Sequence, residues 1–152
     1  MLAALGAEVL AADADGKLQD ARRAAERLVL ASNQQGSLRQ QVEAIVLLAR
    51  ICRHSRDADS LRRGRDAAGI GVRLVRTPRL RTDEGLVIAT ELERAAGLVA
   101  SGRFGEGWAA ARQWCFYPEA DLAGWVWTSM GRTPPVLLGR PTRADGGRLG
   151  HG

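Results

Sequence analysis

The residues of this sequence best suited to bond chemistry are Cys52 and His54, two positions apart. A thiol beside an imidazole is a minimal nucleophile and base, because the imidazole can accept the thiol proton. Both residues fall in a segment with helical periodicity, and residues two apart on a helix point to different faces. The pair is therefore not arranged as a dyad, and no other nucleophile with a base stands out. We predict no catalytic residues and a protein that is not an enzyme.

Metal coordination is equally poorly supported by the sequence. A structural zinc site needs about four ligands at characteristic spacing, whereas this chain has only Cys52, Cys115, His54 and His151 to offer as sulfur or imidazole ligands. We therefore predict no metal-binding and no cofactor-binding residues. Both cysteines are interpreted as buried thiols, since free cysteine is among the residue types most often buried.

Positive charge is concentrated in the middle of the chain. The formal net charge is +5, but residues 50–81 hold ten arginines against three aspartates, a net +7, which leaves −2 for the remainder. Because phosphate contacts dominate nucleic-acid affinity, a basic nucleic-acid-binding module is one hypothesis. The alternative is a solvated, partly paired surface, since no aromatic residue is interleaved for base stacking. The candidate nucleic-acid contacts are Arg62, Arg63, Arg65, Arg76, Arg79 and Arg81.

Every aromatic residue lies within residues 104–127. Most of these side chains are expected to be core that closes one end of the fold. The others are expected to line a groove for a peptide or a small effector, because aromatic residues are enriched at interaction hot spots. If the chain is part of a larger protein, the same patch faces a further repeat. The candidate partner-binding residues are Phe104, Trp108, Trp114, Trp125 and Trp127.

These candidates must be positioned by helices, because apolar residues recur at helical spacing along most of the chain. The run 42–52 is apolar on nearly every face and needs neighbours on more than one side. Ser37, Asp57 or Asp59, and Thr82 or Asp83 are candidate N-caps, and Glu91 with Arg94 is interpreted as a pair on a helix surface. Six helices are predicted, at about 2–12, 17–32, 37–54, 58–74, 82–101 and 104–116.

The length of 152 residues fits one domain. We assign residues 1–130 to a helical domain and residues 131–152, which are rich in Gly, Pro and Arg, to a disordered or extended tail. No apolar run approaches the roughly 18 residues of a membrane span, and no basic region precedes the first apolar segment as in a signal peptide. We expect a cytoplasmic protein that does not contact membranes. The absence of an N-cap or leader suggests that the chain starts inside a larger protein.

A weak internal repeat marks the turns between paired helices. The stretches 16–21, 56–61 and 102–107 share a small or polar residue, a charge, an apolar position and an acidic or polar position, and equivalent positions are 40 and 46 residues apart. Such separations suit helical hairpins with long connections. The sequence therefore predicts an all-α stack of about three antiparallel helical hairpins.

These turns resemble those of tetratricopeptide repeats. Gly102, Phe104 and Glu106, with Gly107 in the small position, match the interhelical turn best; Leu48, Ala49 and Ala68 fit apolar and small positions of the two repeat helices. The stretches 36–51 and 79–85 further resemble the helical-repeat sensor region of large ATP-dependent LuxR-type transcription regulators of the maltose-regulator kind. The resemblance covers roughly residues 2–115 and implies an α-solenoid.

The chain departs from that family in two ways. It lacks a phosphate-binding Gly-x-x-x-x-Gly-Lys-Ser/Thr motif, and no helix-turn-helix follows Trp127. ATP and DNA binding are therefore not carried over. We predict a non-catalytic scaffold that binds a protein, peptide or small effector in a groove formed by the first helices of each pair, in transcriptional regulation or signalling.

Overall fold

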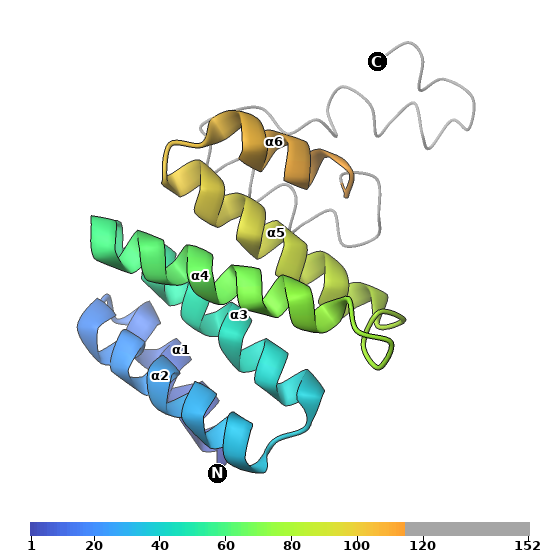
Figure 1. Cartoon of the computed structure of the whole chain (residues 1–152). Helices are drawn as coiled ribbons and strands as arrows, with labels where there is room; N and C mark the ends of the chain where they lie inside the picture. The colour runs from blue at the N-terminus through green and yellow to red at the C-terminus, as the bar shows by residue number, and fades with distance from the viewer. Residues whose placement is uncertain (115–152) are drawn as a thin grey trace, which may run out of the picture.

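The computed structural model describes residues 1–114, which form six α-helices and no strand (Figure 1). The predicted all-α fold is confirmed, and the helix boundaries agree with the periodicity to within a few residues. The tail assigned to residues 131–152, Cys115, and Trp125 with Trp127 lie outside the described residues. The helices are α1 Leu2–Ala14, α2 Leu18–Gln35, α3 Leu38–Ser55, α4 Ala58–Val75, α5 Glu84–Ala100 and α6 Phe104–Arg112.

Successive helices pair as antiparallel hairpins, α1 with α2, α3 with α4, and α5 with α6. The hairpins stack in chain order, because α2 packs on α3 and α4 packs on α5, while α3 also contacts α5. Figure 1 shows this order as layers that rise from α1 and α2 to α5 and α6. In residues 1–114 no helix is long and apolar enough to cross a membrane.

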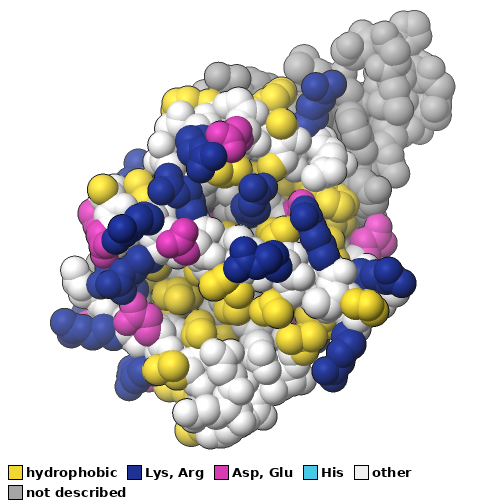
Figure 2. Space-filling view, viewed as in Figure 1, with side chains coloured by type: hydrophobic (Ala, Val, Ile, Leu, Met, Phe, Trp, Pro, Cys, Tyr) yellow, Lys and Arg dark blue, Asp and Glu magenta, His cyan; other side chains and the backbone are white. Residues whose placement is uncertain are grey.

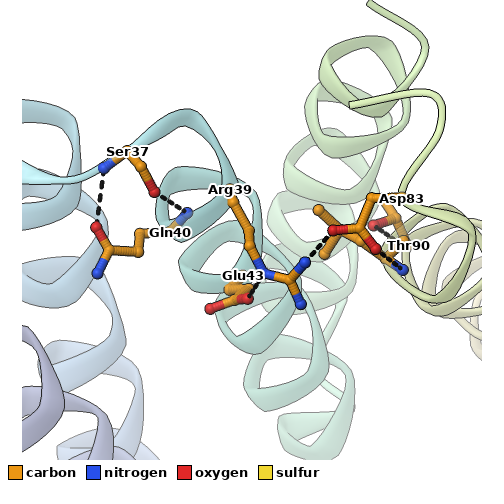
Figure 3. Close-up of polar contacts among 7 residues, drawn as sticks. Ser37, Arg39, Gln40, Glu43, Asp83 and Thr90 are labelled. Atoms are coloured by element: carbon orange, nitrogen blue, oxygen red, sulfur yellow. Dashed lines mark hydrogen bonds and ion pairs between the residues drawn. The ribbon is translucent and has the colours of Figure 1, made fainter. Parts of the chain in front are cut away.

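Three polar residues fix the starts of the long helices. Ser37 and Gln40 form a reciprocal capping box at α3, Asp57 caps α4 by accepting a hydrogen bond from the amide of Ser60, and Asp83 caps α5. Each satisfies amide groups that have no partner in the first turn of a helix. Figure 3 shows the capping box, and shows Arg39 of α3 bridging Glu43 and Asp83. The same residues that begin α3 and α5 therefore also join their ends.

The most enclosed helix is α5 rather than α3, which the sequence placed at the centre. On α5, Ile88 is fully buried and Leu92, Ala95 and Ala96 are nearly so. Both helices meet three neighbours, α3 packing against α2, α4 and α5, and α5 against α3, α4 and α6. The interpretation of Glu91 as a surface partner of Arg94 is wrong, since Glu91 is buried and accepts from Arg76 at 2.9 Å.

A buried ion cluster joins α3 to α5. Glu93 of α5 is 4 % exposed, and its carboxylate lies 2.8 Å from Nε of Arg53 and 3.4 Å from Nε of Arg50. Burial lowers the pKa of Arg53, although the Glu93 carboxylate opposes that shift. Since an isolated buried charge is strongly unfavourable, the pair makes the α3–α5 contact specific.

Two glycines allow close approach between helices. A Cβ at Gly107 of α6 would lie 2.5 Å from Cγ2 of Val99 and 2.9 Å from the carbonyl oxygen of Ala95. A Cβ at Gly64 of α4 would lie 3.1 Å from Cβ of Cys52. Gly64, which weakens helix propensity in α4, therefore has a packing reason.

Candidate functional site

An open hollow of about 470 Å³ lies between α4 and α5 and is lined by four arginines. We call it the arginine groove. Figure 2 shows Lys and Arg side chains gathered over α4 and α5 with few acidic side chains between them. Its lining residues are Arg65, Asp66, Gly69, Ile70 and Arg73 of α4, Arg94 and Leu98 of α5, and Arg103 of the α5–α6 turn.

Three of the four groove arginines lack the acidic partners that most other arginines of residues 1–114 have. Within residues 1–114, no carboxylate oxygen lies within 4.0 Å of the guanidinium groups of Arg65, Arg73 or Arg94. Arg103 pairs with Glu106 at 2.8 Å. Three unpaired arginines thus share the hollow with the carboxylate of Asp66, a net charge of +2 when the Arg103–Glu106 pair is counted as neutral. Repulsion among clustered like charges destabilises a fold, so such a cluster is typical of a surface that meets anions.

Helix geometry explains how α4 contributes this surface. Arg65, Gly69 and Arg73 are spaced four residues apart, so they form one stripe along the helix. Gly69 leaves a gap in the stripe, because a Cβ there would meet no atom within 4 Å. Ile70 lies beside the gap with 43 % of its surface exposed. The groove therefore combines guanidinium groups with an apolar floor.

The structure separates the six arginines predicted to contact nucleic acid. Arg62 pairs with Asp59 at 2.8 Å, Arg63 pairs with Asp59 and Glu26, and Arg76 pairs with Glu91. Arg65 lines the groove. Arg79 and Arg81 are exposed in the α4–α5 loop, with no carboxylate partner among residues 1–114.

Sequence reasoning missed three lining residues: Arg73, Arg94 and Arg103. Arg73 had a usable signal, because it stands eight residues after Arg65 on one helix stripe. Arg94 and Arg103 had none, since their place depends on how α5 packs on α4.

The described residues of the predicted aromatic partner site lie in two different surroundings. Trp108 and Trp114 are partly buried and pack on the α5 core cluster. Phe104 is 51 % exposed and lines a separate hollow of about 310 Å³ beside the ends of α3 and α5. Trp125 and Trp127 lie outside the described residues.

A hollow of about 700 Å³ between α1 and α2 is less suited to selective binding. Acidic and basic side chains alternate around it, and Arg27 pairs with Glu8 across its rim. Its charged lining residues are Glu8, Asp15, Lys17, Asp20, Arg23, Glu26 and Arg27. Because these charges nearly cancel, the arginine groove is the better candidate despite its smaller volume.

Comparisons with protein families, with curated proteins and with solved structures give no match. The resemblance to tetratricopeptide repeats and to LuxR-type regulators therefore stays an expectation drawn from the sequence. Among residues 1–114 no group of three His, Cys, Asp or Glu side chains is placed to hold a metal ion.

Cys52 and His54 have different surroundings. Cys52 is 1 % exposed and packs on α4, whereas Nδ1 of His54 lies 3.0 Å from a carboxylate oxygen of Asp13. Burial raises the pKa of the Cys52 thiol to about 11. The predicted buried thiol is confirmed for Cys52, and its reactive thiolate form is scarce near neutral pH.

Alkaline pH is expected to destabilise the fold through Cys52. The folded state favours the neutral thiol, so this contribution is complete below the ordinary pKa of 9.0 and is lost as pH rises to about 11. The free energy of unfolding is expected to fall by about 2–3 kcal/mol more over this window than in Cys52→Ala, which lacks the thiol. Urea titrations at several pH values measure both chains, and equal pH slopes would contradict the expectation.

Proposed function

We propose that this chain is a non-catalytic helical-hairpin scaffold that binds an acidic segment of a partner protein in the arginine groove. The observation that carries the proposal is the set of guanidinium groups of Arg65, Arg73 and Arg94, which have no carboxylate partner within residues 1–114 and surround the exposed Ile70. The resemblance to a sensor region supports a role in transcriptional regulation or signalling.

The charge and the shape of the arginine groove both favour an acidic peptide segment as its ligand. Guanidinium groups bind carboxylates through paired, charge-assisted hydrogen bonds. The apolar floor around Ile70 offers area that an aliphatic side chain of a peptide can cover. The groove lies between the second helix of one hairpin and the first helix of the next, and not along the first helices alone as the sequence suggested.

Nucleic acid is the second candidate, favoured by Arg79 and Arg81. These exposed residues follow α4 and extend the positive charge beyond the groove. However, the residues that line the groove include no aromatic side chain for base stacking. The peptide therefore fits the described surface better.

Charge reversal in the groove is expected to weaken binding of a fluorescein-labelled peptide rich in Glu and Leu. Arg73→Glu replaces an attraction with a repulsion and is expected to raise Kd about tenfold, equivalent to about 1.4 kcal/mol. Arg23→Glu on α2 is the matched control, because it changes net charge equally, is well exposed and lies outside the groove. Fluorescence anisotropy at about 0.1 M salt measures both variants.

The same assay distinguishes the two candidates. If a labelled single-stranded oligonucleotide binds more tightly than the peptide, and its affinity falls steeply with salt, the nucleic-acid hypothesis replaces the peptide hypothesis. Equal weakening of peptide binding by Arg73→Glu and Arg23→Glu would place the contact outside the groove.

A further inference from the structure

The register between α4 and α5 fixes the order of the groove residues. The Cβ position of Gly97 on α5 lies 3.6 Å from Cγ of Arg65, and that of Gly71 on α4 lies 3.1 Å from Cγ2 of Thr90. Because the two helices are antiparallel, Arg94 lies between these levels, part-way from Arg65 toward Arg73. Arg103, in the turn after α5, lies beyond the Arg65 end.

The directions of the side chains then assign the arginines to the two ends of the groove. Side chains on a helix lean toward its N-terminus. Arg65 therefore leans toward Arg103, while Arg94 leans the opposite way, toward Arg73. Ile70 lies between the levels of Arg65 and Arg73 on α4, whereas Leu98, next to Gly97, lies at the Arg65 end. The groove thus has Arg65 beside the Arg103–Glu106 ion pair at one end, Arg73 and Arg94 at the other, and Ile70 between them.

The distance between the ends suits an extended chain. Arg65 and Arg73 are eight residues apart on α4, which corresponds to about 12 Å along the helix axis. In an extended peptide, residues i and i+4 are about 13 Å apart and residue i+2 points the same way, midway between them.

We infer that the arginine groove recognises an extended segment with the pattern acid-x-apolar-x-acid, in which one carboxylate meets Arg65, the other meets Arg73 and Arg94, and the apolar side chain covers Ile70. This inference rests on the proposed function and names the partner segment that the groove selects. Neighbouring acids alone would reach only one end of the groove. Selectivity therefore comes from the spacing of the acids rather than from their number.

Two labelled peptides of identical composition test the spacing. One contains Glu-Ser-Leu-Ser-Glu and the other Glu-Glu-Leu-Ser-Ser, each between Gly-Ser flanks, and their Kd values are measured by fluorescence anisotropy on the full chain. The spaced peptide is expected to bind about tenfold more tightly. Gly69→Leu places a side chain in the open centre and is expected to remove this preference. Gly6→Leu on α1 is the control, because a Cβ there also meets no atom within 4 Å.

The outcomes separate this inference from the proposed function. Equal binding of both peptides, weakened by Arg73→Glu, would overturn the spacing rule and leave the acidic-peptide function standing. Binding of neither peptide would overturn both. A preference for the spaced peptide that survives Gly69→Leu would place the recognition elsewhere and overturn the inference.

Discussion

Replacing Glu93 with alanine is expected to lower the free energy of unfolding by about 3–5 kcal/mol, because it removes one partner of a buried ion pair. Glu93 is 4 % exposed and Arg53 is 8 % exposed, and their charged atoms lie 2.8 Å apart. Burial already lowers the pKa of Arg53, and the substitution removes the carboxylate that opposes this shift. Urea unfolding followed by circular dichroism measures the loss from the transition midpoint and slope.

Two further variants identify the cause. Glu106→Ala removes an exposed carboxylate from a pair with Arg103 and is expected to cost less than about 1 kcal/mol. The double variant Arg53→Met with Glu93→Leu removes both buried charges and is expected to be more stable than Glu93→Ala. A loss in Glu93→Ala no larger than that in Glu106→Ala would mean that the ion cluster does not hold α3 against α5.

Helix boundaries could be predicted because their signals are local. Ser37, Asp57 and Asp83 each cap a helix through contacts with residues three positions away. The apolar periodicity likewise depends on residues within one or two turns. The sequence therefore predicted the six helices and their pairing without any knowledge of tertiary contacts.

The burial of α5 could not be predicted in the same way. Glu91 and Glu93 are buried because α5 meets three other helices, and their partners Arg76 and Arg53 lie 15 and 40 residues away in the sequence. A charged residue on a helix is usually exposed, so local reasoning placed Glu91 on the surface. Only the packing of α3 and α4 against α5 reveals which acids are enclosed.

The arginine groove was predictable only in part, for the same reason. Charge clustering identified the middle of the chain, but Arg62, Arg63 and Arg76 are neutralised by acids on the same or neighbouring helices. Arg94 was excluded because its neighbour Glu91 looked like a partner. A binding surface of this kind depends on which arginines remain unpaired after folding, and composition does not contain that information.

Truncation of Ile88 to alanine is expected to lower the stability of the fold strongly, whereas truncation of Ile70 is expected to change it little. Ile88 is fully buried on α5, so Ile88→Ala removes apolar contacts, leaves a cavity and is expected to lower the free energy of unfolding by about 2–5 kcal/mol. Ile70 is 43 % exposed, and alanine has the higher helix propensity, so Ile70→Ala is expected to change stability by less than about 1 kcal/mol. Chemical denaturation measures both effects.

Peptide binding is expected to show the reverse order, because Ile70 lines the arginine groove while Ile88 packs in the core cluster between α5 and α6. Ile70→Ala is expected to weaken binding of the Glu-Ser-Leu-Ser-Glu peptide several-fold, consistent with about 1 kcal/mol of lost apolar contact. Ile88→Ala, measured where it remains folded, is expected to bind that peptide as the parent chain does. If Ile70→Ala leaves binding unchanged, the leucine of the peptide does not contact Ile70, and the groove attracts its ligand through charge alone.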